Sequence, residues 1–358
     1  MQRITPPMLA WFEANKRALE WRTDPLPYYV WVSEIMLQQT RVSAVRPYFR
    51  RFVRELPDAA SLARCGEERL LKLWEGLGYY SRARNLQKAA RLIVERYDGI
   101  LPSDPALLRS LPGIGSYTAG AVASIAYGVP EPAVDGNVLR VLSRVTGSAA
   151  CIDDPKVKRL YEERLRGFLK GDPAVPPGQF NQALMEIGAL VCLPNGVPEC
   201  GKCPLRAQCA ALREGQTGSI PVRREKKTRR VEERTVVLVR DAEKTLIRKR
   251  PAKGLLAGMW ELPNFAGHLS EREVLDEAYR IALKPLRILP LPDAKHIFTH
   301  VEWRMKGYQL LVEDMCDPGP EKAGYLAVSP DRVNAQYPIP AAFAKYAEYL
   351  KIRIGYKK

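Results

Sequence analysis

The feature that most constrains this fold is a change in the spacing of apolar residues between residues 215 and 234. From residue 235 we interpret the period as two, which predicts strands, and Thr235–Arg240 with Thr245–Arg248 is expected to form a hairpin. Before residue 215 the spacing is helical, as in the stripe Trp31, Ile35, Gln38, Val42, Val45, Phe49. We therefore predict an all-α domain over residues 1–215 and an α+β domain over residues 234–358.

The same reasoning predicts further elements in both domains. Helices are expected around Leu70–Trp74, Asn85–Tyr97, Tyr117–Tyr127, Glu271–Leu283 and Ala341–Ile352. A half-buried strand is expected at Phe298–Met305, where Thr299, Val301, Trp303 and Met305 alternate with the other side chains. Short intervals between prolines and glycines in the first domain favour a compact helical arrangement.

A basic segment separates the two patterns. Residues 221–230 contain almost no apolar side chains, and we interpret residues 216–233 as an interdomain linker. A plain solvated linker fits this composition as well as one that lies along DNA. The chain has 56 Lys and Arg against 40 Asp and Glu, a net charge of +16. This balance favours a polyanionic partner, because neutralised phosphates release counterions, although a basic surface also maintains solubility.

The chain carries no signal for a membrane or for secretion. No apolar run reaches transmembrane length, and residues 1–6 lack the apolar core of a secretory signal. We therefore expect a soluble intracellular protein without membrane partners, monomeric, and cytoplasmic with nucleoid association if its source is bacterial.

Four of the seven cysteines form a cluster at Cys192, Cys200, Cys203 and Cys209, with gaps of seven, two and five residues. Intracellular proteins rarely keep disulfides, so metal ligation is the leading interpretation. Four thiolates this close suit either a tetrahedral zinc ion or an iron–sulfur cube. Lys202 and Arg206 suggest that this cysteine loop also contacts phosphate.

A glycine-rich turn lies between two helical patterns at residues 111–115, with the sequence Leu-Pro-Gly-Ile-Gly. Gly113 and Gly115 allow a positive φ and a close backbone approach. Amides at the start of the helix that begins near Ser116 would then bind phosphate. A simple packing corner between helices is the alternative.

An aspartate follows this turn, within Val134-Asp135-Gly136-Asn137-Val138. Asp135 is suited to capping a helix, and it is also suited to facing DNA. The order of turn, aspartate and cysteine loop resembles the helix-hairpin-helix DNA glycosylase superfamily, in its iron–sulfur branch. The resemblance implies a helix-hairpin-helix fold for the first domain, with a [4Fe–4S] cluster on the four cysteines.

Within that branch the chain resembles the adenine DNA glycosylase (MutY-type) family. The motifs that carry the resemblance are Trp31–Thr40, Gly76–Tyr80, Phe180–Gln182 and the pair Trp21-Arg22. The resemblance implies a monofunctional enzyme of base excision repair. Its partner would be double-stranded DNA in which adenine is mispaired with 8-oxoguanine or guanine, and adenine would be removed after base flipping.

The resemblance places the catalytic carboxylates at Glu34 and Asp135. Adenine is a poor leaving group until its N7 is protonated, and a general acid contributes about 10²–10⁴-fold. Burial beside the apolar stripe would raise the pKa of Glu34 and keep a proton available. An ionised Asp135 would stabilise the oxocarbenium-like sugar electrostatically or covalently. Without the resemblance, Glu34 reads as an ordinary carboxylate on a helix surface.

One position separates two chemistries within the superfamily. Where the bifunctional endonuclease branch has a lysine nucleophile, this chain has Tyr117. We therefore expect base removal without Schiff-base strand cleavage. Arg140 cannot replace the amine, because its guanidinium stays protonated. The resemblance further implies that Arg22 and Gln182 line the adenine pocket and that Gln39 and Tyr79 enter the base stack.

The second domain resembles the nudix-like C-terminal domain of the same family at Gly254–Pro263. The hydrolase signature is missing, since Glu271, Glu273 and Glu277 do not have its spacing, so we predict a binding module. The family reads 8-oxoguanine with a loop of the form Phe-Ser-His, and this chain has Phe298, Thr299 and His300. Threonine keeps the hydroxyl, so recognition is expected to survive with altered detail.

Two alternatives stay open at the level of sequence. A bifunctional glycosylase for pyrimidine lesions would share the fold, but Tyr117 and the second domain argue against it. A non-enzymatic nucleic-acid or iron–sulfur binding protein would need neither Glu34 nor Asp135. The gap of seven residues between Cys192 and Cys200, where the family commonly has six, puts the path of the loop in question rather than the cluster.

Overall fold

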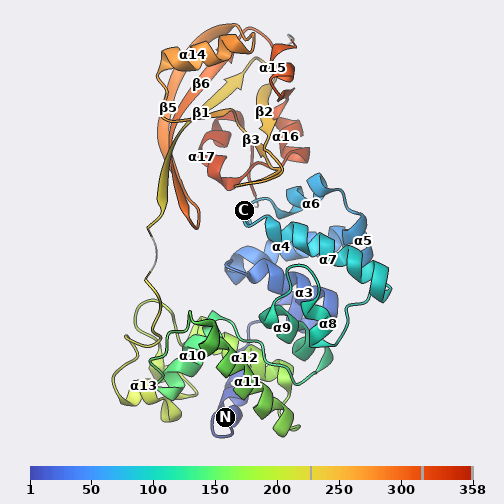
Figure 1. The fold of residues 1–358 in the computed structure, drawn as a ribbon, viewed down its shortest axis with the longest axis vertical. Coiled ribbons are helices and arrows are strands. Elements are labelled where there is room, and N and C mark those ends of the chain that lie inside the picture. Colours follow the sequence, from blue (N-terminus) through green and yellow to red (C-terminus); the bar gives the residue numbers. More distant parts are fainter. Residues whose placement is uncertain (226–227, 316–317, 356–358) are drawn as a thin grey trace. The chain divides into compact units, whose positions relative to one another are not determined.

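The structure is a computed structural model that describes residues 1–225, 228–315 and 318–355. The chain divides into two compact units (Figure 1). Unit 1 comprises Met1–Arg64 and Asn85–Lys226, and unit 2 comprises Cys65–Arg84 and Lys227–Lys358. The short segment Cys65–Arg84, which lies inside the helical part of the sequence, thus packs with the C-terminal part of the chain.

Among the described residues of unit 1, every regular element is a helix. Its core is built from apolar side chains that include Met8, Phe12, Val138, Phe180 and Leu184. Its elements are α1 (Thr5–Asn15), α2 (Glu20–Thr23), α3 (Pro27–Leu37), α4 (Val42–Glu55), α5 (Ala59–Arg64), most of α7 (Ser81–Tyr97), α8 (Pro105–Arg109), α9 (Ser116–Tyr127), α10 (Gly136–Thr146), α11 (Pro155–Gly171), α12 (Pro177–Leu190), η1 (Cys200–Lys202), η2 (Arg206–Gln208) and α13 (Ala210–Arg213).

Local signals fix where the central helices of unit 1 begin and end. Asp135 caps α10, and Gly147 ends it in the left-handed conformation that favours glycine. Helix α12 approaches α10 closely at Gly188, where a Cβ would lie 2.6 Å from the Cβ of Asn137. Because no side chain stands between the backbones there, the start of α10 lies directly beside α12.

The apolar stripe from Trp31 to Phe49 does not lie on a single helix. Its first residues belong to α3 and its last to α4, and the chain breaks between them. Gln39 has a φ of 59°, which a helix cannot accommodate. Helix α3 is buried on nearly every side, whereas α4 buries a single stripe. Apolar residues therefore recur at helical spacing on both sides of the break, and periodicity alone could not reveal it.

Unit 2 contains a mixed seven-stranded sheet whose main order is β3-β2-β1-β6-β5, with β4 paired to β1 and β7 to β2. Strands β1 and β6 run parallel, and β5 and β6 run antiparallel. The elements are α6 (Glu67–Trp74), β1 (Arg230–Arg240), β2 (Thr245–Lys249), β3 (Trp260–Glu261), β4 (Asn264–Ala266), α14 (Glu271–Arg280), β5 (Pro285–Ile297), β6 (Val301–Val312), α15 (Gly319–Lys322), β7 (Tyr325–Val328), α16 (Pro330–Gln336), η3 (Ala341–Phe343), α17 (Ala344–Ala347) and η4 (Glu348–Leu350).

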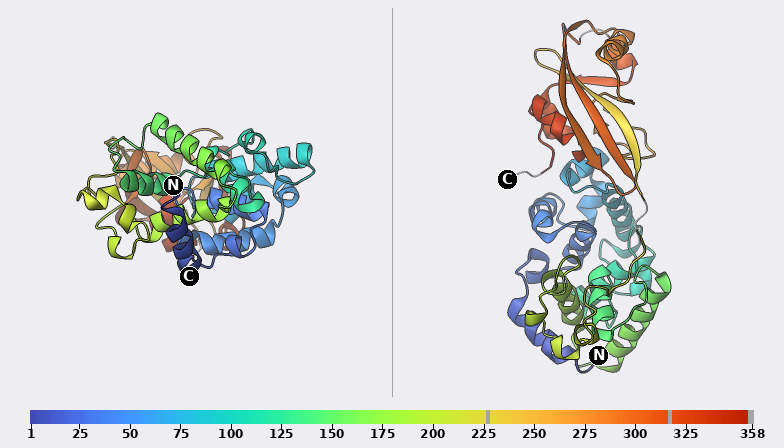
Figure 2. Two further views of the ribbon diagram at one scale, coloured as in Figure 1. Left: turned by 90° about the horizontal axis from the view of Figure 1, so that it is seen from below. Right: turned by 90° about the vertical axis from the view of Figure 1, so that its left-hand side faces the viewer.

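Both faces of this sheet are covered by helices. Val236 and Leu238 pack in a core with Phe343 and Tyr346, whereas Val237 packs with α14 on the opposite face. This follows from the alternation of side chains along a strand. The twist of the long strands is visible in the right-hand view of Figure 2. The all-α and α+β fold classes predicted from the sequence are confirmed.

Several predicted elements shift at their ends. The hairpin at residues 235–248 forms from β1 and β2, but β1 begins at Arg230, so the end of the predicted linker is a strand. Lys226 and Lys227 of that linker lie outside the described residues. The expected helix over residues 341–352 consists of three short pieces. No helix in the described ranges is long and apolar enough to cross a membrane.

Candidate active site

A central cleft in unit 1 brings together residues that the sequence placed far apart. Its walls come from α2, α3, α9, α10 and α12 and from the break after α3. The predicted site residues that line this central cleft are Arg22, Glu34, Gln39, Tyr117, Asp135 and Gln182. The cleft therefore unites both predicted carboxylates with the predicted pocket residues.

Glu34 lies on the buried side of α3 and is only 6% exposed. Burial raises the pKa of this carboxyl to about 7, although the hydrogen bond from Tyr117 opposes the rise and the nearby Asp135 adds to it. Tyr117 Oη donates to Glu34 Oε2 at 2.5 Å. A carboxyl with a pKa near neutral pH is suited to act as a general acid.

Tyr117 stands on the first turn of α9, directly after the glycine turn. Burial raises the pKa of its phenol well above the ordinary value, and the negative charge of Glu34 raises it further. The hydroxyl is therefore neutral and serves as a hydrogen-bond donor. It also lies 3.4 Å from the sulfur of Met185, which closes the pocket on the α12 side.

Asp135 is the N-cap of α10, as one of the two sequence interpretations predicted. Its Oδ1 accepts from the backbone N–H of Val138 at 2.8 Å, and its Oδ2 accepts from Asn137 Nδ2 at 2.8 Å. Burial raises the pKa of Asp135, while these two bonds lower it. The bonds hold the carboxylate in one orientation on the wall of the cleft, at a helix N-terminus, where negative charge is favoured.

A chain of hydrogen bonds connects this aspartate with the cysteine loop. Arg140 Nη2 donates to Asn137 Oδ1 at 2.7 Å, and Arg140 Nε donates to the carbonyl of Cys192 at 2.7 Å. Arg140 is 3% exposed, so its guanidinium depends on these acceptors. Sequence reasoning considered Arg140 only as a substitute amine and missed this connection.

The predicted pocket residue Arg22 is held by a buried glutamate that sequence reasoning missed. Arg22 Nη2 donates to Glu186 Oε2 at 2.8 Å, and Arg17 Nε donates to Glu186 Oε1 at 2.7 Å. Burial alone would raise the pKa of Glu186, but the bonds from Arg17 and Arg22 outweigh it and hold the pKa at about 2. The available signal was the spacing of Gln182 and Glu186, which places both on one face of α12.

The two residues predicted to enter the base stack share an unusual backbone conformation. Gln39 in unit 1 has a φ of 59°, and Tyr79 in unit 2 has a φ of 50°. Non-glycine residues rarely adopt this left-handed region, and such positions concentrate at functional sites. Tyr79 is 45% exposed, and its hydroxyl lies 3.0 Å from Thr299 Oγ1.

The two glycines of the turn before α9 have different roles. Gly113 has a φ of 78°, and a Cβ there would lie 2.8 Å from the Cβ of Asn85. Gly115 has extended backbone at the N-cap of α9, with no side-chain cap and open space around its Cα. The amides of the first turn of α9 therefore lack a capping side chain, as a phosphate site requires.

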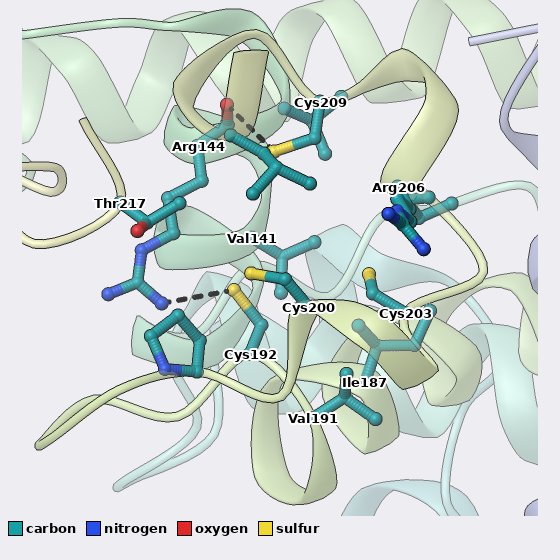
Figure 3. A pocket seen from close by; sticks show the side chains of 14 residues that line it. Val141, Arg144, Ile187, Val191, Cys192, Cys200, Cys203, Arg206, Cys209 and Thr217 are labelled. Atoms are coloured by element: carbon teal, nitrogen blue, oxygen red, sulfur yellow. Dashed lines mark hydrogen bonds between the residues drawn. The ribbon is translucent and has the colours of Figure 1, made fainter. Parts of the chain in front are cut away.

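The four clustered cysteines line one pocket (Figure 3). Arg144 Nη1 donates to Cys192 Sγ at 3.2 Å, and Cys209 Sγ donates to the carbonyl of Arg144 at 3.4 Å. Burial raises the pKa of Cys203 to about 11, and the other three cysteines add to this rise. Within the described ranges, no three His, Cys, Asp or Glu side chains form a group that could hold a metal ion.

Phe298, Thr299 and His300 form the turn between β5 and β6, which we call the reading loop. The strand begins at Val301 rather than at Phe298 as predicted, because Phe298 N–H closes the turn by donating to the Val301 carbonyl at 2.8 Å. The ring of Phe298 packs edge-on against Trp303, with centroids 5.0 Å apart. Thr299 and His300 are exposed. The turn therefore presents two polar side chains to solvent, while Phe298 holds it against Trp303.

The glutamates of α14 have local partners. Glu273 closes a capping box with Ser270, and Glu277 pairs with Arg280. Both contacts stabilise the helix itself. That the second domain binds rather than hydrolyses stays a prediction.

Comparison with known proteins defines the class of protein first. The family model of HhH-GPD superfamily base excision DNA repair proteins matches residues 32–166, and the NUDIX domain model matches residues 235–349. A solved thermostable thymine-DNA glycosylase is 26% identical, with a TM-score of 0.53, and the match covers 60% of this chain and 96% of that one. A solved complex of endonuclease III with DNA gives 25% identity and a TM-score of 0.51 over 60% of this chain and 95% of that one. The fold of the helical part of the chain is that of a helix-hairpin-helix DNA glycosylase.

The relatives narrow this class further. The adenine DNA glycosylase of Mus musculus is 36% identical over 86% of this chain and 70% of its own length. Those of Homo sapiens and Arabidopsis thaliana are each 35% identical, over 86% and 87% of this chain and 66% and 57% of their own lengths. The chain belongs to the adenine DNA glycosylase family. The resemblance and the enzymatic activity predicted from the sequence, a DNA glycosylase for adenine, are confirmed.

Proposed function

We propose that this glycosylase removes adenine mispaired with 8-oxoguanine or guanine in double-stranded DNA, with Glu34 as general acid and Asp135 as the group that stabilises the sugar. The observation that carries the proposal is Glu34 itself. It is buried in the central cleft, hydrogen-bonded to Tyr117, and its pKa is raised to about 7. At neutral pH a large fraction of Glu34 therefore holds the proton that adenine needs in order to leave.

The reaction begins when adenine flips into the central cleft. Gln182 and the Arg22 side chain that Glu186 orients bind the base. Glu34 donates its proton to N7, and the electron pair of the C1′–N9 bond passes to adenine. The carboxylate of Asp135 stabilises the positive charge on the sugar. Water then adds to C1′, and its proton returns to Glu34.

Tyr117 determines which chemistry follows. Its neutral hydroxyl donates to Glu34, and it offers no amine for a Schiff base. The enzyme therefore removes the base and leaves the strand intact. Borohydride is expected to trap little covalent adduct during turnover, and efficient trapping would favour a bifunctional enzyme.

Other predicted residues bind the duplex. Gln39 and Tyr79 enter the base stack, and the backbone at Gly113 and Gly115 binds a phosphate. The reading loop contacts the base opposite adenine through Phe298, Thr299 and His300. The basic residues of the linker 216–233 add phosphate contacts, which makes binding depend on salt. In this division of labour, residues 1–215 carry the chemistry and residues 234–358 recognise the lesion.

The four cysteines are suited to a [4Fe–4S] cluster. All four side chains line one pocket, and four thiolates at this spacing are a donor set that iron–sulfur cubes use. A bound cluster would cross-link Cys192, Cys200, Cys203 and Cys209 and so hold the cysteine loop against Arg144. Anaerobically purified protein should contain four irons with inorganic sulfide per chain. Stoichiometric zinc without sulfide would contradict the cluster.

A single-turnover assay tests the proposed function. The substrates are duplexes that place adenine opposite 8-oxoguanine, guanine or cytosine. We expect excision in the order 8-oxoguanine, then guanine, with cytosine slowest. Equal rates for the three duplexes would contradict mispair recognition, whereas adenine excision itself would stand.

A further inference from the structure

Two buried charges hold α6 against the C-terminal residues of unit 2, and we call them the clasp. Lys72 is 9% exposed and Glu75 is 4% exposed. Lys72 Nζ lies 2.9 Å from Glu75 Oε2. Charged side chains are almost never buried in this way unless they are paired and hydrogen-bonded. The hydrogen-bond partners of Lys72 and Glu75 therefore indicate the role of the clasp.

The clasp binds backbone groups at the end of α16. Lys72 Nζ donates to the carbonyls of Val333 and Tyr337, each at 3.2 Å. The Val333 carbonyl also accepts from the Tyr337 N–H at 3.1 Å, so the lysine adds a second donor at the C-terminus of α16, where a cation is favoured. Glu75 Oε1 accepts from the backbone N–H of Ile339 at 2.7 Å. Lys72 thus binds two carbonyls of residues 333–339, and Glu75 binds one N–H of the same stretch. Figure 1 shows α6 below α16.

Apolar contacts connect residues 333–343, part of which the clasp binds, with Phe298 at the start of the reading loop. Ile339 and Phe343 are fully buried in the same core as Trp303. The ring centroids of Phe343 and Trp303 are 6.0 Å apart, and those of Trp303 and Phe298 are 5.0 Å apart. A displacement of residues 333–343 would therefore change the support of Phe298.

The segment that carries the clasp also touches the reading loop directly. Tyr79 follows α6 by a few residues, and its hydroxyl lies 3.0 Å from Thr299 Oγ1. This hydrogen bond is exposed, so by itself it contributes little to the position of the loop. The buried clasp, at the other end of the same segment, supplies the rigid attachment that the exposed contact lacks.

We propose that Lys72 and Glu75 are positioning residues for recognition of the base opposite adenine, because they hold the C-terminal residues on the segment 65–84 and so keep Thr299 beside Tyr79. The proposal rests on the reading role given to Phe298–His300 under the proposed function. Neither clasp residue is among those that line the central cleft.

The test compares single-turnover excision of adenine opposite 8-oxoguanine and opposite guanine. Lys72→Met removes the cation and its bonds to Glu75, Val333 and Tyr337. Glu75→Gln keeps the size and an acceptor for Ile339, and so guards against a variant that fails to fold. We expect the ratio of the two rates to fall about 2- to 30-fold in Lys72→Met, the usual range for residues that couple to a distant site. The rate opposite guanine should stay within about twofold of wild type, and Glu75→Gln should show a smaller fall of the ratio.

A matched control comes from the same segment. Lys249 Nζ pairs with Glu68 Oε1 at 2.8 Å, but both side chains are about half exposed. Lys249→Met removes a cation that joins the same two parts of unit 2, and we expect an unchanged ratio because exposed pairs contribute little. Tyr79→Phe combined with Lys72→Met should lose less than the sum of the single effects, because both act on the placement of Thr299.

The outcomes separate the clasp from the function on which it rests. A high wild-type ratio that both clasp variants keep, or a proportional fall of both rates, would overturn the clasp alone. A wild-type ratio near one would overturn the reading role of Phe298–His300, and the clasp with it.

Discussion

The central cleft of unit 1 and the reading loop of unit 2 place polar groups in opposite environments. In the cleft, Glu34 and Glu186 are buried, and the pKa of one is raised to about 7 while that of the other is lowered to about 2. In the loop, Thr299 and His300 are exposed, and Phe298 beside them packs against Trp303. Burial strengthens electrostatic interactions, so changes in the cleft should have large effects and changes in the loop small ones.

The largest effect is expected for Glu34→Gln. Glutamine keeps the size of the side chain but cannot deliver a proton, so single-turnover excision should fall by about 10²–10⁴-fold or more. Duplex affinity should be retained, which gel-shift titration of the same protein measures. A wild-type rate in this variant would remove Glu34 from the role of general acid.

The next effect is expected for Glu186→Gln, measured as free energy of unfolding. The variant leaves Arg17 and Arg22 without their buried partner, and breaking such a pair costs about 3–5 kcal/mol. Because the pKa of Glu186 is lowered, its contribution is present above the unfolded carboxyl pKa and is lost as pH falls toward 2. Glu13→Gln, which breaks the exposed pair with Lys16, is the control and should change stability little.

A smaller effect is expected for His300→Ala in the reading loop. Loss of one hydrogen-bonding contact to the lesion should cost about 1–3 kcal/mol in discrimination. The measurement is the ratio of excision rates opposite 8-oxoguanine and guanine. An unchanged ratio would move lesion recognition away from this loop and remove the contrast between the two regions.

The pH dependence of excision provides a further test of the buried carboxyl of Glu34 in the cleft. The acid form of Glu34 is required and its pKa is about 7, so excision should fall by about tenfold per pH unit above that value. The raised pKa also means that ionisation of Glu34 destabilises the fold as pH rises through 7. Glu34→Gln should therefore raise the melting temperature at pH 8 more than at pH 5. A rate that stays flat from pH 6 to pH 9 would contradict the assignment.

The smallest effect is expected for Thr299→Ser. The substitution keeps the hydroxyl beside Tyr79 and removes one exposed methyl, so the 8-oxoguanine-to-guanine ratio should change by less than about threefold, as surface substitutions do. Thr299→Val, which removes the hydroxyl and keeps the shape, is the matched comparison and should lower the ratio more. Equal effects of Thr299→Ser and Thr299→Val would mean that the hydroxyl does not contribute to recognition of the lesion.

The sequence by itself determined the features that depend on residues near one another in the chain. The change of period predicted a helical and a mixed domain, and the glycine turn predicted the start of α9 near Ser116. Motifs such as Trp31–Thr40 identified the family and named Glu34. These signals are local, because helical and strand patterns are set by neighbours up to four residues away.

Only the tertiary structure determined the burial and the hydrogen-bond partners of those residues. The spacing of Gln182 and Glu186 places both on one face of α12, but only the structure shows that Glu186 binds Arg17 and Arg22 and that α3 ends before Gln39. The pKa of Glu34 depends on burial and on Tyr117 and Asp135, which come from elsewhere in the chain. The clasp of Lys72 and Glu75 binds residues 333–339, from the far end of the chain. Burial and hydrogen-bond partners depend on which distant segments pack together, and no spacing within a single segment encodes that.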